Sequence, residues 1–313
     1  MKSNYRYIVK AFMAMAVIAG TTSCDDFLDR EPMSSISPET YYSTAAQLEA
    51  NLNDEYPNVL PSFGQWTYGI FGEDKGTDNQ IEVNANDRYT QDRWKVPHSE
   101  SDNWKFERIY RINFFLSEAL PKFGEDMSGS QNTISGSVAT IKHYIGEMYF
   151  LRAYEYFKKL QLFGDFPIIN QPLADEMEAL REASKRFPRN EVARFIISDL
   201  DKAYAYMSDV DMATTRINKD VAMLVKSRVA LFEATWLQNF KGTAFVPGGE
   251  GWPGASLHNN YQYPSGNIDN EVKYFLEQAV EASKLVADKY KGSLTENTGV
   301  LQQSADDPSN PYF

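Results

Sequence analysis

Few residues in this chain have the type and spacing to carry out chemistry, and the most unusual is Cys24, the only cysteine. A single cysteine excludes an internal disulfide framework. The three histidines, His98, His143 and His258, have no neighbouring cysteine and show no zinc-ligand spacing. The GxSxG, HExxH and GxxxxGKS/T motifs of hydrolases, metalloproteases and nucleotide-binding loops are also absent from the sequence. We therefore expect neither a metal site nor a cofactor.

Carboxylates leave one catalytic alternative open, which is glycoside hydrolysis. That reaction needs only two carboxyl groups about 5 to 10 Å apart, and 43 Asp and Glu residues offer many pairs. Glu73, Asp74 and Asp78 are the candidates because they lie in an aromatic-rich stretch. Solvated loop charges explain the same residues more simply, so we expect a protein that is not an enzyme.

The segment before Cys24 indicates that this thiol is an attachment point. Residues 1–10 carry three basic side chains and no acid, residues 11–19 are wholly apolar, and residues 20–23 are small. This is the order of a secretory signal, and the apolar run is shorter than the roughly 20 residues of a bilayer span. The pattern predicts a bacterial lipoprotein signal over 1–23, with acyl chains on Cys24 that hold the protein on a membrane. An ordinary cleaved signal with an incidental cysteine is the alternative.

Aromatic residues gather in two stretches without helical periodicity, 61–100 and 242–267. A pyranose ring has an apolar C–H face, so an exposed Trp or Tyr ring can cover it while Asn, Asp or Arg bind the hydroxyl groups. The same rings could instead pin their loops to the body of the protein. The candidate ligand-binding residues from these two stretches are Trp66, Tyr68, Asn79, Tyr89, Arg93, Trp94, Trp252 and Tyr261.

The charge pattern limits the class of partner. The formal charge is −12, from 31 basic and 43 acidic residues, and the basic residues do not cluster. Nucleic-acid binding needs clustered Lys and Arg to neutralise phosphates, so we expect no nucleic-acid partner. An acidic protein with interspersed charges favours neutral or cationic partners over polyanions.

A mostly α-helical body is predicted to position the two loops. Apolar residues recur at helical spacing over 104–120, 138–162, 190–207, 218–236 and 269–290. An earlier helix begins behind a capping box of Thr44 and Gln47. We expect Pro57 to end that helix and Pro121 to end the one at 104–120.

Four stretches resemble the SusD/RagB-type outer-membrane lipoproteins. They are "GEMYFLRAYEYFKKLQLFGDFPII" at 146–169, "WKFERIYRINFFL" at 104–116, "INKDVAMLVKSRVALFEA" at 217–234, and "CDDFLDREP" with the following "PETYYST". In the first of these, Arg152 either satisfies a carbonyl or carboxylate or is solvated, and Gly164 can take the left-handed conformation that ends a helix. We expect these residues to be scaffold rather than site.

The resemblance implies tetratricopeptide-like helix pairs that support long, irregular, aromatic-rich loops. It also implies a lipid-anchored protein on the exposed face of the outer membrane, because the acids after Cys24 resemble the export signal of Bacteroidetes-type lipoproteins. Such proteins capture oligosaccharides for uptake by a SusC-like TonB-dependent transporter and are not enzymes. The alternatives are a peptide- or protein-binding lipoprotein of the same build and a lipid-anchored glycoside hydrolase.

These patterns divide the chain into three parts. Residues 1–23 are the predicted signal, residues 24–43 are an acidic, polar tether, and residues 44–313 are the helical domain. Because members of the family are usually longer, we expect 44–313 to be its N-terminal part, with the C-terminal half missing.

Overall fold

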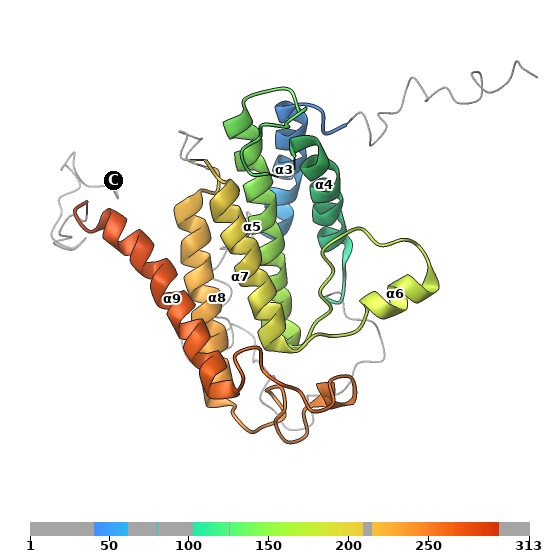
Figure 1. Ribbon diagram of the computed structural model, residues 1–313, viewed down its shortest axis with the longest axis vertical. Coiled ribbons are helices and arrows are strands. Elements are labelled where there is room, and N and C mark those ends of the chain that lie inside the picture. The colour runs from blue at the N-terminus through green and yellow to red at the C-terminus, as the bar shows by residue number, and fades with distance from the viewer. Residues whose placement is uncertain (1–40, 62–79, 81–102, 125, 209–214, 294–313) are drawn as a thin grey trace, which may run out of the picture.

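Seven α-helices make up the part of the chain that the computed structural model describes, namely residues 41–61, 80, 103–124, 126–208 and 215–293. They are α3 (Ala45–Val59), α4 (Glu107–Phe123), α5 (Val138–Phe163), α6 (Met177–Ala183), α7 (Arg189–Tyr206), α8 (Lys219–Asn239) and α9 (Ile268–Tyr290), with a 3₁₀-helix, η3 (Pro253–Ser256), before α9 (Figure 1). Within these ranges the β pairing is limited to isolated bridges, such as the one between Phe166 and Phe187. The prediction of a mostly α-helical protein is confirmed.

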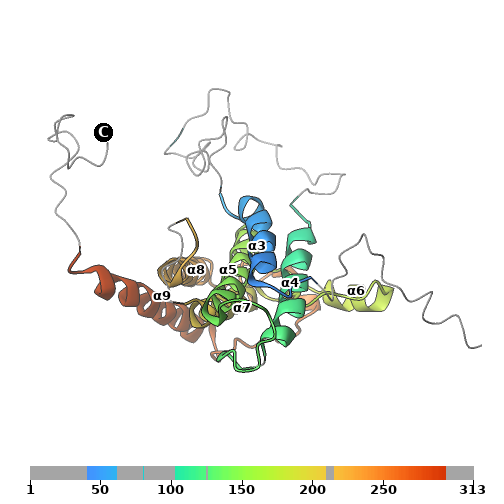
Figure 2. The same ribbon diagram turned by 90° about the horizontal axis from the view of Figure 1, so that it is seen from above.

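The helix α5 lies at the centre of the body. It packs against α3 and α4 on one side and against α7 on the other, and α8 and α9 follow beyond α7 (Figures 1 and 2). Buried residues lie all around α5 rather than along one stripe, as is typical of a helix enclosed by others. The helices α7, α8 and α9 each pack on the one before and alternate in direction (Figure 1), which is the paired arrangement that the family resemblance implied.

The helix starts follow the predicted caps. Thr44 and Gln47 form a capping box in front of α3. Asn218 precedes α8, and its side chain accepts the backbone N–H of Val221 at 3.0 Å. Each of these bonds satisfies an N–H that the first turn of a helix leaves unpaired. The short helix α6 had no counterpart among the predicted helices, since none of its residues is buried and no apolar stripe marks it.

The prediction that Pro57 and Pro121 end their helices was wrong, because both lie inside, in the last turn of α3 and α4. A proline in the last turn removes a single backbone hydrogen bond, and its fixed φ is compatible with a helix. The residues that follow are buried, Val59 in α3 and Phe123 in α4. Packing of these side chains therefore keeps the final residues helical.

Small and charged residues of α5 fix the neighbouring helices, as expected for scaffold. A Cβ on Gly146 would lie 2.8 Å from the backbone N of Met207, at the end of α7. Arg152 is buried and donates to both carboxylate oxygens of Asp199 on α7, at 2.6 and 2.8 Å. It also donates to Oδ1 of Asn113 on α4 at 2.9 Å. Of the alternatives left open for Arg152, the buried carboxylate is its main partner.

Candidate ligand-binding site

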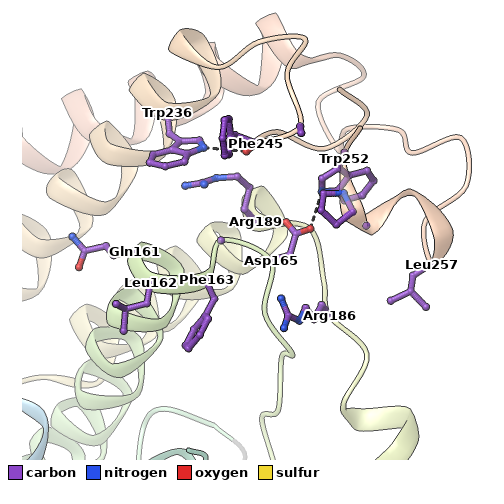
Figure 3. Close-up of a pocket in the computed structure, with 14 residues that line it drawn as sticks. Gln161, Leu162, Phe163, Asp165, Arg186, Arg189, Trp236, Phe245, Trp252 and Leu257 are labelled. Atoms are coloured by element: carbon purple, nitrogen blue, oxygen red, sulfur yellow. Dashed lines mark hydrogen bonds between the residues drawn. The ribbon is translucent and has the colours of Figure 1, made fainter. Parts of the chain in front are cut away.

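A pocket of about 480 Å³ opens where α5 ends, α7 begins and α8 ends, and the loop between α8 and α9 folds over it (Figure 3). Its lining combines aromatic, aliphatic and charged side chains with small residues, and consists of Gln161, Leu162, Phe163, Gly164, Asp165, Arg186, Arg189, Trp236, Ala244, Phe245, Trp252, Pro253, Gly254 and Leu257. This volume falls in the range of about 300–1,000 Å³ that is usual for small-ligand sites.

The turn after α5 brings the first polar group to the pocket. Gly164 has φ of 68°, a left-handed conformation that glycine adopts at no steric cost, and the predicted role of Gly164 is confirmed. The next residue, Asp165, accepts the backbone N–H of Arg189 at 2.9 Å and the indole N–H of Trp252 at 2.7 Å. Burial raises the pKa of the Asp165 carboxyl, and these two hydrogen bonds oppose the rise.

Arg189 lines the pocket and is held by a buried ion pair with Glu233 that joins α7 to α8, and we call this part of the wall the floor. Arg189 donates from Nε to Glu233 Oε1 at 3.0 Å and from Nη2 to Oε2 at 2.9 Å. The guanidinium carbon also lies 4.1 Å from the ring centre of Trp236, a cation–π contact. A two-point pair of this kind fixes both side chains, so the floor is rigid before any ligand arrives.

The loop over the pocket carries two of the predicted binding residues, Trp252 and Tyr261. Trp252 is 5% exposed, its indole binds Asp165, and its ring lies 5.6 Å from that of Tyr261. Tyr261 does not line the pocket; its hydroxyl donates to Oδ1 of Asn190 at 3.0 Å, and burial raises its pKa. Both rings attach the loop to the helices, and Trp252 lines the pocket as well.

A second anchor fixes the loop where it enters α9. Arg194 of α7 donates to the two carboxylate oxygens of Glu271, at 2.7 and 2.8 Å. Asn190 and the backbone N–H of Ser265 bind the same carboxylate. Burial of Glu271 opposes its ionisation, but these hydrogen bonds outweigh the burial and lower its pKa. The loop is thus tied to the turn after α5 through Trp252 and to α7 through Tyr261 and Glu271.

Among the residues that line the pocket, the sequence interpretation selected only Trp252, and three of the groups that it missed stand out. Phe245 is 61% exposed at its rim, Trp236 stands on α8, and Arg186 lies at the edge below Asp165 (Figure 3). Phe245 belongs to the aromatic run of the second loop, which is a usable signal. Trp236 has the helical spacing of a core residue and Arg186 follows no pattern, so the sequence gives no reason to select either.

The remaining candidates, Cys24, Trp66, Tyr68, Asn79, Tyr89, Arg93 and Trp94, lie outside the described residues, as do the carboxylates considered for glycoside hydrolysis. Among the residues that are described, no group of His, Cys, Asp and Glu side chains has the arrangement of a metal site. No helix in the same ranges has the length and apolar character needed to cross a bilayer.

Comparison with known proteins matches this chain to a protein family. A profile of the SusD-like family described as "Starch-binding associating with outer membrane" matches residues 26–231. The SusD-like protein P2 of Formosa agariphila is 25% identical over 253 residues, which are 77% of this chain and 46% of that protein. SusD-like protein P25 of the same organism is 25% identical over 233 residues, 68% of this chain and 41% of the relative. The chain therefore spans less than half the length of these relatives.

Solved structures give similarities of the same kind. A SusD-like protein from Bacteroides fragilis aligns with a TM-score of 0.44 and 19% identity, over 68% of this chain and 39% of the other. A SusD-like carbohydrate binding protein from Bacteroides vulgatus aligns with a TM-score of 0.42 and 15% identity, over 79% of this chain and 45% of the other.

Proposed function

Because this chain belongs to the SusD-like family described as starch-binding and associating with the outer membrane, we propose that it captures an oligosaccharide in the pocket beneath the loop between α8 and α9. The observation that carries the proposal is an open pocket of about 480 Å³ with an exposed aromatic ring at its rim and a rigid charged floor.

The chemistry of the lining supports a sugar. Phe245 presents an exposed ring that can cover the apolar C–H face of a pyranose. The carboxamide of Gln161 and the peptide groups of the loop are polar partners for hydroxyl groups. Arg189 and Trp236 are held in place by Glu233 and by each other. Little side-chain entropy is then lost when a ligand binds, which favours affinity.

Further ligand contacts come from the first aromatic stretch in this proposal. Trp66, Tyr68, Asn79, Tyr89, Arg93 and Trp94 keep their role as candidates there, and Tyr261 acts by holding Trp252. Replacing Trp66 or Trp94 by Ala is expected to weaken sugar retention, and unchanged retention in both variants would remove this stretch from the site.

The cellular setting is part of the same proposal. Cys24 carries the acyl chains that anchor the protein to the outer membrane, with the acidic tether between the anchor and the helices. The captured oligosaccharide passes to a SusC-like TonB-dependent transporter, for which the protein acts as a lid. The protein holds its ligand and does not cleave it, in keeping with a family description that names binding.

Titration of the full chain with a panel of oligosaccharides tests the proposal. Phe245→Ala should lower affinity about tenfold, since a ring contact of about 1.4 kcal/mol is lost. Leu231→Ala is the matched control, because Leu231 is an apolar residue 50% exposed on α8 that does not line the pocket. Equal affinities of the two variants would refute the site.

Two further readouts separate the alternatives. Binding of peptides with no binding of any oligosaccharide would favour the peptide-binding lipoprotein. Release of reducing ends from a bound oligosaccharide would favour the glycoside hydrolase. Either result would overturn oligosaccharide capture without cleavage.

A further inference from the structure

Arg186, at the rim of the pocket, is an exposed residue whose position is fixed from three directions. The next residue, Phe187, pairs with Phe166 through backbone hydrogen bonds of 3.0 and 3.1 Å. Nε2 of His258 donates to the carbonyl oxygen of Arg186 at 2.7 Å. The guanidinium carbon of Arg186 lies 4.6 Å from the ring centre of Trp104. Backbone, loop and side chain are therefore all restrained.

The contact with Trp104 does not occupy the N–H groups of Arg186 in a bond to a carboxylate. A guanidinium carries five N–H donors in one plane. No carboxylate pairs with Arg186 among the residues that the structure describes. The result is a planar fork of donors, held in one place and open to solvent.

The other charged groups at the pocket already have hydrogen-bond partners. Arg189 is paired with Glu233, and both oxygens of Asp165 accept N–H groups. The formal charges of these three and of Arg186 cancel, but only the charge of Arg186 is both exposed and unpaired within the described chain. A ligand in the pocket thus meets one positive group.

The net charge of the protein sets a limit on what this group can bind. With a formal charge of −12, the protein repels a densely charged polyanion over a range of about 8–10 Å. A single acidic group among neutral sugars is repelled only weakly by the net charge of the protein. The same group is attracted strongly by Arg186, which lies close to it in the pocket. The fork of a guanidinium matches the geometry of a carboxylate or a sulfate ester, with two parallel hydrogen bonds.

We propose that Arg186, held on Trp104, binds the carboxylate or sulfate of a sparsely acidic oligosaccharide, so that the ligand class of this pocket is acidic rather than neutral glycan. The inference rests on the proposed function and adds the chemical class of the ligand to it. Trp104 and His258 act as positioning residues for the fork.

Pairs of oligosaccharides that differ only in their acidic group test this assignment. Suitable probes are glucuronic-acid-substituted and plain xylo-oligosaccharides, and sulfated and desulfated galactan oligosaccharides, titrated into the full chain. The acidic member of at least one pair should bind about tenfold more tightly, because two charge-assisted hydrogen bonds form that the neutral member lacks. The preference should shrink as salt is added.

Variants of Arg186 then test whether this residue causes the preference for acidic oligosaccharides. Arg186→Gln should abolish the preference, and Arg186→Lys should keep only part of it because the fork is lost. Arg181→Gln, which removes an equal charge from a side chain 76% exposed on α6, should leave the preference intact. Unchanged melting temperatures would show that each variant is folded.

The outcomes separate this inference from the proposed function. If the protein binds oligosaccharides but shows no acidic preference, or keeps the preference in Arg186→Gln, the role of Arg186 is refuted and oligosaccharide capture stands. If no oligosaccharide binds to the unaltered protein, the proposed function fails, and this inference fails with it.

Discussion

Replacing Trp252 by Phe tests whether its indole N–H holds the loop over the pocket. The variant keeps an aromatic ring beside His258 and Tyr261 but removes the donor that lies 2.7 Å from Asp165 Oδ2. Loss of a hydrogen bond to a buried charged group costs about 1–3 kcal/mol. Because Asp165 is only partly buried, water can compensate in part, and we expect a loss of about 1–2 kcal/mol. That loss lowers Tm by roughly 2–8 °C for a folded unit of this size.

The pH dependence of this loss identifies its cause. The indole N–H favours the ionised carboxylate, so its removal raises the pKa of Asp165 beyond the rise that burial already causes. The stability difference between the two proteins is therefore complete where Asp165 is ionised in both. It shrinks as the pH falls through the raised pKa of the variant. Urea unfolding of the full chain, followed by circular dichroism between about pH 4 and pH 8, measures the difference.

Trp236→Phe is the matched control for this experiment. The indole of Trp236 donates to the carbonyl oxygen of Phe245 at 3.0 Å in an exposed position, where water replaces the lost bond. We expect a cost that does not depend on pH where Asp165 titrates, because the lost bond involves no titratable group. Equal losses in the two variants at every pH, or no loss in Trp252→Phe, would refute the view that the partly buried carboxylate of Asp165 holds the loop.

Three other perturbations test separate parts of the structure. Gly146→Ala should destabilise the protein by about 1–3 kcal/mol, because its Cβ would meet the backbone of Met207 at 2.8 Å. Gly292→Ala is the control, because no atom apart from those of its chain neighbours lies within 4 Å of the added Cβ, and it should leave the stability unchanged. Urea unfolding compares the two variants. Folding lowers the pKa of Glu271, so its ionised carboxylate stabilises the unaltered protein above the unfolded pKa of about 4.3. That stability is lost as the pH falls through the lowered folded pKa. Glu271→Gln should lack this contribution, and a pH dependence of unfolding similar to that of the unaltered protein would contradict the reasoning. Cys24→Ser should release the protein from the membrane fraction, and mass spectrometry should show that acyl chains are absent.

Much of the scaffold could be predicted from the sequence because its signals are local. Apolar residues at helical spacing and the Thr44 and Asn218 caps marked five long helices and the start of α3 to within a turn. Two prolines misled the prediction of helix ends, because the burial of the residues beyond them depends on packing against other helices. The resemblance to the SusD/RagB-type lipoproteins also rested on sequence alone, and the family is confirmed.

The composition of the pocket was decided by tertiary structure. The sequence correctly marked the second loop as aromatic, but it could not tell a ring that faces solvent from a ring that pins the loop. Trp252 is buried because it reaches a carboxylate 87 residues away in the chain, whereas Phe245 of the same loop stays exposed. Arg186 acquires its proposed role only because folding brings it onto Trp104. The periodicity of a helix depends on residues within a few turns of one another, so the sequence reveals it. The exposure of a side chain and its hydrogen-bond partners depend on contacts between distant segments, which the order of residues does not reveal.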